Sequence, residues 1–534
     1  MNLPVSLLTW LAAVTPVVVL LVLLIRFRWG VAEASPISLC IAVVTGLTLF
    51  GAPLPLVAGE IAKGIWNGVA VMAVVIPAIL IFEVTSEAGA FEPFRRGMQK
   101  FSPNELLQVL TVAWVFASFL QGVTGFGVPV AIVAPLLVGI GVRPFWAVVL
   151  PLLGHAWATT FGTLAVAWEA LVLQTGISGD TLLSTAAWSA LFTWFMDFAA
   201  GLAICWFYAR GEGLRRGFAA VAAISLLHGG GQLVLSQVNQ VLCNFLVSAL
   251  GLALVWFLGR MPAYAKSYRA ERSPMMERGT IASAQAENGA ELTLFEAFLP
   301  YTVLTAITLF VLLIPQVKAA LSFLVVGFSF PETATAHGFV NPAAPGYAAI
   351  SVFTHAGTFL VLSSLAGYLF FKSKGAITAG GAGRICRRTF EKAAPSTIAV
   401  ILLICMARVM GGTGQVLVLA KGTAMAAGPF YAVVAPFIGL LGAFMTSSCM
   451  ASNILFANFQ QTMADLLNFP APILLGVQTG GASIGNVLCP GNVLLGTTTA
   501  GILGMEGEIL KKVIPLGCAV CLLCGLVVAA ALMF

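Results

Sequence analysis

Two short polar segments interrupt apolar runs of the chain, and their side chains suit the binding of a small anion. The first spans residues 121–127 and the second 447–453. A helix can break at membrane depth only where protein buries the break or where it lines a wet cavity. The freed N–H groups of a half-helix then attract an anion, helped by the helix dipole. The candidate ligands are Gln121, Thr124, Gly125, Phe126, Gly127, Ser447, Ser448, Ser452 and Asn453.

Two neighbouring segments, 155–160 and 478–486, add further candidates. A small 2-hydroxy acid needs donors for its carboxylate, a donor–acceptor group for its hydroxyl and an apolar wall for its carbon chain. Each hydroxyl could instead bond to a carbonyl of its own helix, and the glycines could serve only close helix packing. The prediction therefore depends on the clustering of polar residues. The added candidates are His155, Thr159, Thr160, Gln478, Thr479, Ser483 and Asn486.

Three ionisable residues lie in or beside apolar runs, where a charge is costly and usually functional. His155 suits proton transfer because histidine titrates near neutral pH, although a structural histidine is the alternative. Arg408 is a candidate counter-charge for the substrate carboxylate, or else an interfacial arginine. Asp197 could pair with a buried donor or carry protons. His155 and Asp197 are therefore the candidates for proton coupling.

The elements that must position these residues are transmembrane helices. The chain has 534 residues, of which 60% are hydrophobic and 9% charged, whereas soluble domains carry about 25% charged residues. Because roughly 20 apolar residues span the hydrocarbon core, we predict an all-α polytopic membrane protein with about 12–14 spans. Two shorter apolar runs, Val128–Ile140 and Ile454–Leu467, are predicted partial spans.

The distribution of charge predicts the topology. The first apolar run lacks a cleavage-site pattern and is followed by Arg26 and Arg28, which indicates an uncleaved anchor with its N-terminus outside. The net charge of +6 reflects basic cytoplasmic loops and does not indicate a nucleic-acid partner. Neither a P-loop nor an H-E-x-x-H pattern occurs, so we expect a protein that is not an enzyme and that needs no cofactor or metal. The oligomeric state is not readable.

An internal repeat is indicated around the two breaks. Pro144 aligns with Pro470 at the same separation along the chain at which Gly154 aligns with Gly480. The first copy is entered from a basic segment and the second from a charge-poor one, so the copies should cross the membrane in opposite directions. We predict scaffold helices over 1–63, a first inverted repeat over 64–208, connecting helices over 209–389 with a cytoplasmic linker at 260–293, and a second inverted repeat over 390–534, with broken helices or re-entrant hairpins in both repeats.

At these breaks the sequence resembles the lactate permease family. The resemblance implies proton-linked symport of a 2-hydroxymonocarboxylate, L-lactate or glycolate, across a bacterial inner membrane. It also implies similarity to a wider ion-transporter group, in which hairpins enter the membrane from both sides. The motifs that carry it are S-F-L-Q-G-V-T-G-F-G-V-P-V-A-I-V-A-P-L-L-V-G (118–139), S-N-I-L-F-A-N-F-Q (452–460), T-G-G-A-S-I-G-N-V-L-C-P (479–490) and G-I-L-G-M-E-G-E-I-L (501–510).

The chain departs from the family pattern at several positions of the expected site. Gln121 stands where the family usually has an acid, Cys449 where many members have an aspartate, and Asn486 where a lysine is frequent. The N-T-A-P segment of familiar members is replaced by H-A-W-A-T-T at 155–160. We therefore predict a divergent branch: a secondary carrier that imports L-lactate or glycolate with H⁺, or alternatively another small organic anion with Na⁺.

Overall fold

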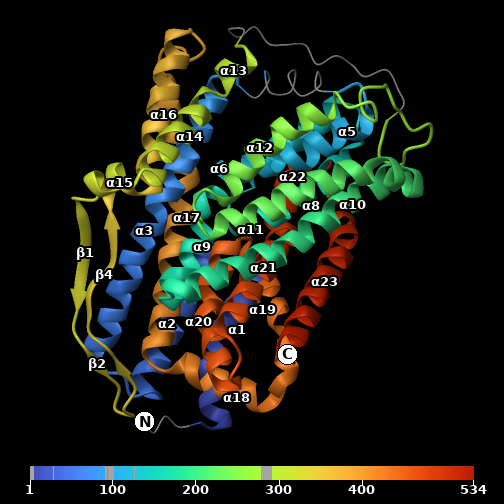
Figure 1. Ribbon diagram of the computed structural model, residues 1–534. Coiled ribbons are helices and arrows are strands. Elements are labelled where there is room, and N and C mark those ends of the chain that lie inside the picture. The colour runs from blue at the N-terminus through green and yellow to red at the C-terminus, as the bar shows by residue number, and fades with distance from the viewer. Residues whose placement is uncertain are drawn as a thin grey trace.

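The computed structural model describes residues 5–27, 29–90, 93, 102–125, 127–277 and 292–533. This part of the chain forms an elongated bundle of helices (Figure 1). Nine of its helices are long and apolar enough to cross a membrane, and two bent helix pairs raise the number to eleven. The predicted helical membrane fold is confirmed, and the protein is a multi-pass membrane protein.

Among the described residues the count of nine to eleven helices differs from the 12–14 predicted spans because several apolar runs are fused into one helix, shortened or partly extended. Helix α10 (Gly179–Ser225) passes through a kink at Ala209 and Arg210 and so joins two expected spans. The expected partial span at 128–140 is the short helix α7 (Val128–Gly139). The expected span at 347–371 begins as a β-strand.

The first half of the chain ends at the kink in α10. Its elements are α1 (Leu7–Ile25), α2 (Val31–Thr48), α3 (Leu54–Glu87), α5 (Glu105–Leu110), the π-helix η1 (Thr111–Phe116), α6 (Ala117–Val123), α7, α8 (Pro144–Gly154), the 3-10 helix η2 (Ala156–Ala158), α9 (Gly162–Thr175) and α10. The connecting elements are η3 (Leu226–Gly230), α11 (Gly231–Ser236), α12 (Cys243–Leu258) and α13 (Leu294–Ala297).

The second half contains the strands and the remaining helices. Its elements are α14 (Leu299–Leu313), α15 (Pro315–Leu321), β1 (Val325–Phe330), β2 (Thr333–Ala334), β3 (Val340–Asn341), β4 (Ala344–Ser351), η4 (Val352–Thr354), α16 (Ala356–Ser373), α17 (Gly381–Gly412), α18 (Gln415–Ala427), η5 (Gly428–Phe430), α19 (Tyr431–Thr446), α20 (Cys449–Leu467), α21 (Ala471–Leu488), α22 (Pro490–Thr499) and α23 (Glu506–Ala531).

The two halves repeat the same order of helices. α16 has the same length as α2, and α21 follows α8 at the same separation along the chain at which α23 follows α10. α2 packs against α17 as α16 packs against α3, and α7 packs against α22 as α20 packs against α9. The predicted limits of the repeats at residues 64 and 390 both fall inside helices, α3 and α17.

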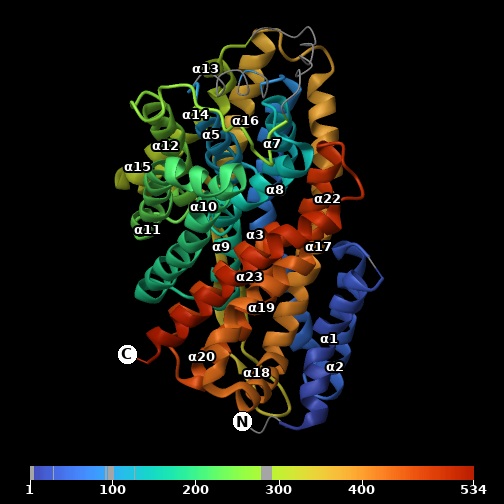
Figure 2. The same cartoon turned by 90° about the vertical axis from the view of Figure 1, so that its right-hand side faces the viewer.

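The repeats run through the molecule in opposite directions. α5, which leads into the first break, lies at the upper end of Figure 1, whereas α18, which precedes the second, lies at the lower end. Figure 2 shows the same arrangement from the side. Oppositely directed repeats with interrupted helices are typical of secondary transporters.

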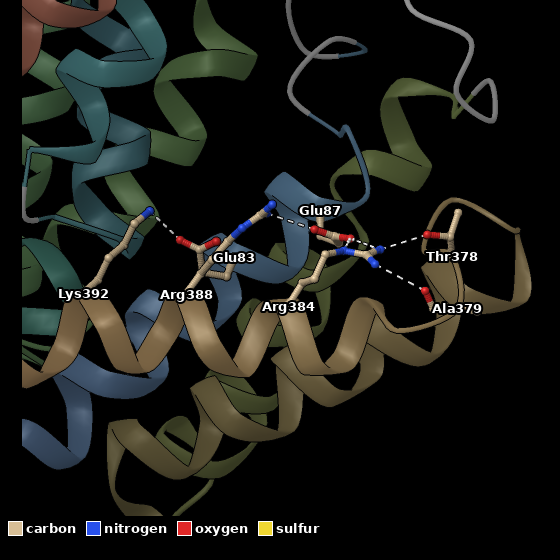
Figure 3. A network of polar contacts seen from close by, with 7 residues as sticks. All are labelled: Glu83, Glu87, Thr378, Ala379, Arg384, Arg388 and Lys392. Atoms are coloured by element: carbon tan, nitrogen blue, oxygen red, sulfur yellow. Dashed lines mark hydrogen bonds and ion pairs between the residues drawn. The ribbon is translucent and has the colours of Figure 1, made fainter.

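Ion pairs fasten the C-terminal end of α3 to the first turns of α17 (Figure 3). Glu87 pairs with Arg384 at 2.6 Å and with Arg388 at 2.9 Å. Lys392 forms an ion pair with Glu83, one turn later in α17 and one turn earlier in α3. The carboxylates are nearly buried while the basic groups remain about half exposed. Long helices from the two repeats are therefore held side by side.

The β-strands form an antiparallel ladder that the sequence analysis did not predict. Val325 of β1 lies opposite Ser351 of β4, with two irregularities along the ladder. Trp66 of α3 donates its Nε1 hydrogen to the carbonyl oxygen of Ala348 at 3.0 Å. The ladder therefore lies along α3, and its apolar residues have the composition of a membrane span without forming a helix.

Part of the predicted linker packs on the first repeat. The carbonyl of Tyr268 accepts from the amide of Glu105 at 3.0 Å, and the carbonyl of Met275 accepts from the amide of Arg143 at 2.8 Å. Residues 278–291 of the linker lie outside the described part. Residues 268–275 thus touch the starts of α5 and α8.

Candidate substrate site

Hydroxyl groups from both repeats meet where the interrupted segments face each other. Thr160 follows η2, and its Oγ1 lies 2.6 Å from Ser483 Oγ and 3.1 Å from Thr479 Oγ1, both on α21. Asn453 of α20 donates from Nδ2 to Thr479 Oγ1 at 2.9 Å and to the carbonyl of Ala167 at 2.8 Å. The Oδ1 atom of Asn453 is buried with no hydrogen-bond partner in the described part of the chain. Four predicted residues are thus brought together, with one acceptor left available.

A small cavity of about 40 Å³ lies beside this junction, and we call it the central cavity. A water molecule needs roughly 10–15 Å³ of such space, so an organic acid requires the walls to move apart. Five predicted residues line the cavity. The lining consists of Gln121, Thr159, Gly162, Thr163, Val166, Ala167, Ser447, Ser448, Cys449, Met450 and Asn486.

Left-handed backbone conformations create the breaks around the central cavity. Gly125 (φ 61°) and Gly127 (φ 80°) lie between α6 and α7, and Ser447 (φ 56°) lies between α19 and α20. Phe126 lies outside the described residues. Thr163 at the start of α9 is also left-handed (φ 51°), which is costly for a β-branched residue and is a feature of functional sites. A Cβ at Gly125 would lie 2.1 Å from Thr163 Oγ1, so only glycine fits there.

The central cavity is electrically neutral, because none of its described lining residues carries a charged side chain. Helix α20 begins at this cavity with Cys449 and Met450, and Ser448 caps it by accepting from the amide of Ala451 at 3.2 Å. The first N–H groups of a helix have no partner within the helix. Together with the helix dipole they favour an anion. Backbone and hydroxyl donors can therefore hold a carboxylate without a basic side chain.

Other predicted residues bond to nearby helices and do not line the central cavity. Ser452 donates to the carbonyl of Gly439 at 2.8 Å, and Gln478 Nε2 donates to Ser452 Oγ at 3.2 Å. These bonds hold α19, α20 and α21 together. Thr124 Oγ1 donates to the carbonyl of Leu120 in its own helix at 2.8 Å. The hydroxyl of Thr124 is thus bonded to a carbonyl of its own helix, which is the alternative to substrate binding for a helical hydroxyl.

Neither proton-coupling candidate lines the central cavity. His155 bonds through Nδ1 to the carbonyl of Pro151 at the end of α8. Asp197 Oδ1 accepts from Trp114 Nε1 at 2.8 Å and lies 3.1 Å from His228 Nδ1. Asp197 and His228 are fully buried. Asp197 therefore pairs with buried donors between packed helices.

Arg408 of α17 forms an ion pair with Glu60 of α3, at the other end of α3 from the pairs of Glu83 and Glu87. Its Nη2 atom is 2.7 Å from Glu60 Oε2, and Lys63 Nζ is 2.7 Å from the other oxygen of Glu60. Its guanidinium also lies 5.5 Å from the ring centroid of Tyr347 in β4. The structure therefore places Arg408 as the partner of a buried glutamate and not at the central cavity.

Ser483 belongs to a G-A-S-I-G stretch at 481–485. In hydrolases a G-x-S-x-G pattern forms a sharp turn between a strand and a helix. Here the whole stretch lies inside α21, and Ser483 Oγ contacts Thr160 and Cys449. The backbone geometry of a nucleophile turn is not found at this serine.

The sequence analysis missed several lining residues next to those it named. Gly162, Thr163 and Met450 line the central cavity. The polar run continues from Thr159 to Thr163 in T-T-F-G-T, a signal that extends beyond the predicted limit at Thr160. Met450 carries no polar signal, so composition alone does not reveal it.

Comparison with known proteins shows the family. Residues 9–534 match the family model described as L-lactate permease. The chain belongs to the L-lactate permease family. It is 25% identical over 522 residues to the L-lactate permease of Escherichia coli (strain K12), which covers 94% of this chain and 92% of that one. It is 24% identical over 527 residues to the glycolate permease GlcA of the same organism, at 94% and 91% coverage.

More distant similarities extend over most of the chain. The L-lactate permease of Halalkalibacterium halodurans is 22% identical over 502 residues, covering 93% of this chain and 92% of that one. Among solved structures, the YdaH transporter of Alcanivorax borkumensis aligns with a TM-score of 0.46 and 14% identity, over 88% of this chain and 87% of that one.

The three single positions at which this L-lactate permease family member departs from the expected pattern meet in one place. Gln121, Cys449 and Asn486 come from three different helices, and all three line the central cavity. The departures therefore concern one neutral cavity.

Proposed function

We propose that the protein is a secondary active carrier that imports L-lactate or glycolate together with a proton. The observation that carries the proposal is the neutral central cavity, where α20 begins between hydroxyl and amide side chains of both repeats. Such a site suits a small anion with a hydroxyl group, because each substrate oxygen can meet a donor. The permeases for lactate and glycolate among the relatives support this substrate class.

The proposed location is a bacterial inner membrane with the N-terminus outside. Figure 3 shows Arg384, Arg388 and Lys392 on the first turns of α17, and α17 begins at the end of the bundle opposite to the start of α1 (Figure 1). Basic residues gather on the cytoplasmic side of membrane proteins. The N-terminal end of Figure 1 is then the outer end. We propose no cofactor for this transport, and the ion involved is the co-transported one.

Transport by purified protein in sealed lipid vesicles tests this proposal. We expect labelled L-lactate and glycolate to accumulate inside when the outside is made acidic, and unlabelled acid of either kind to compete. The same measurement with a sodium gradient at equal pH tests the alternative of Na⁺ coupling. Accumulation that follows sodium alone would replace the proton in the proposal, and a wild-type protein that moves neither acid would remove the substrate assignment.

A further inference from the structure

Two larger cavities flank the central cavity, and the internal repeat relates them. One of about 270 Å³ lies between α3, α9 and the junction of β4 with α16, and one of about 600 Å³ lies between α17, α22 and the start of α2. Ala70 and Val74 line the first, and their equivalents in the Pro144–Pro470 alignment, Ser396 and Val400, line the second. We call them the α9 cavity and the α22 cavity.

Both cavities border the central cavity. Val166 lines the α9 cavity and the central cavity. Ser447 and Ser448 line the α22 cavity and the central cavity. Two related cavities on either side of one site match the geometry of alternating access in inverted-repeat carriers. The substrate would pass from one cavity to the other through the interrupted segments.

The correspondence between the cavities fails at the titratable positions. Glu169 lines the α9 cavity, whereas its equivalent in the same alignment, Leu495, lines the α22 cavity. His355 lines the α9 cavity directly before α16, whereas Gly30, directly before the equivalent helix α2, lines the α22 cavity. Within the described residues, the α22 cavity has no titratable lining residue. The two sides of the central cavity thus differ in their ability to hold a proton.

Glu169 is an acid without a partner in an apolar helix. Glu169 is an exposed residue of α9, and it lines the α9 cavity. No hydrogen bond or ion pair within the described residues engages its carboxylate. An ionisable side chain inside a membrane is expensive, so an unpaired one indicates a functional role.

The surroundings of Glu169 contain one other ionisable group that lines the same cavity, His355. The facing part of α3 is apolar, and β4 contributes Ser351 and backbone. Among the other helices packed against α9, α6 and α21 have no charged residue, α12 contributes the thiol of Cys243, and α20 carries the thiol of Cys449 at its start and the carboxylate of Asp465 near its end. No described basic residue neutralises Glu169 permanently.

We propose that Glu169 is the proton acceptor of this carrier, with His355 beside it in the α9 cavity. The inference rests on the proposed function and assigns its coupling ion to a residue. The carboxylate and the imidazole that line this cavity are groups that can each take up a proton. Protonation of Glu169 removes a negative charge near the substrate site.

The position of Glu169 explains how protonation would favour substrate binding. It follows Val166 and Ala167, which line the central cavity, by three and two residues of α9. Two like charges about 9 Å apart with an effective dielectric constant of about 20 weaken anion binding on the order of tenfold. A proton on Glu169 therefore raises the affinity for a carboxylate, and the anion in turn retains the proton.

Two vesicle assays on Glu169→Gln separate coupling from substrate transport. Exchange of labelled for unlabelled L-lactate at equal pH needs no net proton movement, whereas accumulation driven by an acidic outside does. We expect Glu169→Gln to keep exchange within about twofold of wild type and to lose accumulation at least tenfold, while Glu169→Asp retains part of it. Glu212→Gln, which removes an exposed acid paired with Arg216, should behave as wild type.

Each other outcome overturns the inference in a recognisable way. Full accumulation by Glu169→Gln would place the proton acceptor elsewhere. Loss of exchange by a Glu169→Gln protein with an unchanged melting temperature would make the residue part of the substrate path instead. Loss of accumulation by His355→Gln with retention by Glu169→Gln would transfer the role to the histidine. Wild-type protein that exchanges neither lactate nor glycolate would instead remove the proposed function.

Discussion

The hydroxyl oxygen of Thr160 lies 2.6 Å from that of Ser483, so the interrupted segment between α8 and α9 touches α21 of the other repeat. Both side chains are fully buried, and Asn453 joins them through Thr479. The hydroxyls of Thr160, Thr479 and Ser483 all have partners in this network, and satisfied buried polar groups favour one arrangement of the elements that carry them. This junction is therefore where the two repeats are held in register beside the central cavity.

Removing one hydroxyl from this junction should weaken it. We expect Thr160→Val to lower the melting temperature and to reduce lactate uptake, because two buried hydroxyls lose a partner at a cost of about 1–3 kcal/mol. Thr308→Val is the matched control, since buried Thr308 donates to the carbonyl of Leu304 in its own helix. Thermal melting in detergent and vesicle uptake measure the two effects. Equal losses in the two variants would show that the junction has no special role.

Gly125 should tolerate no side chain. In Gly125→Ala the new Cβ would meet Thr163 Oγ1 at 2.1 Å on a residue with φ of 61°, so we expect uptake to fall at least tenfold. Gly176→Ala is the control, because Gly176 has a similar φ of 67° and no atom within 4 Å of the added Cβ. Adding Thr163→Ala should partly restore Gly125→Ala by removing the colliding oxygen. Rates of lactate uptake, measured at equal amounts of each variant, test this prediction. If Gly176→Ala were as inactive as Gly125→Ala, the effect would come from backbone strain and not from the collision with Thr163.

Arg408 should matter for stability and not for substrate affinity. Arg408→Leu leaves the buried carboxylate of Glu60 with Lys63 alone, and breaking a buried pair costs about 3 kcal/mol. Arg388→Leu removes a partly exposed partner while Glu87 keeps Arg384, so its cost should be below about 1 kcal/mol. Melting temperatures and the lactate concentration for half-maximal uptake test this. A large rise in that concentration for Arg408→Leu, without loss of stability, would return Arg408 to the substrate site.

Asp197 should act in packing. Asp197→Asn keeps one oxygen for Trp114 and disturbs the contact with His228, so we expect a loss of about 1–3 kcal/mol of stability. Accumulation of lactate driven by an acidic outside should remain. A well-folded Asp197→Asn protein that exchanges lactate but cannot accumulate it would make Asp197 the proton carrier and contradict our assignment.

Much of the helical architecture could be predicted from the sequence because its signals are local. Glycine and small polar residues after an apolar run marked the breaks at 121–127 and 447–453, and left-handed residues stand at both. Pro144 and Pro470 marked equivalent helix starts, and helices begin at or just after both. Proline suits the first turn of a helix, which has no need of its missing N–H.

The remaining features depend on tertiary contacts that hydropathy does not report. The apolar residues of β1 and β4 look like part of a span, yet they pair with each other along α3. The partner of Arg408, Glu60, lies in a different repeat and far away in the sequence. His228 lies in a region that the repeat does not include, but its ring stacks on Trp157 in the interrupted segment with centroids 4.6 Å apart.

Which polar residues face the central cavity also depends on side-chain direction. Asn453 and Ser452 are neighbours in sequence, yet Asn453 joins the junction with Thr479 while Ser452 turns to Gly439. Consecutive helical residues point about 100° apart, so a cluster in sequence divides between faces. Glu169 was overlooked because it lies inside an otherwise apolar helix that follows the predicted site.

The binding of labelled L-lactate to purified protein, compared between wild type and Ser447→Gly, tests the central claim most directly. Glycine keeps the left-handed backbone at the second break and removes only the hydroxymethyl side chain of a residue that lines the central cavity. Since a hydrogen bond to a charged group contributes about 1.5–3 kcal/mol, we predict a dissociation constant raised roughly tenfold to a hundredfold with little change in melting temperature. Unchanged lactate binding by Ser447→Gly would show that the interrupted helices do not hold the carboxylate.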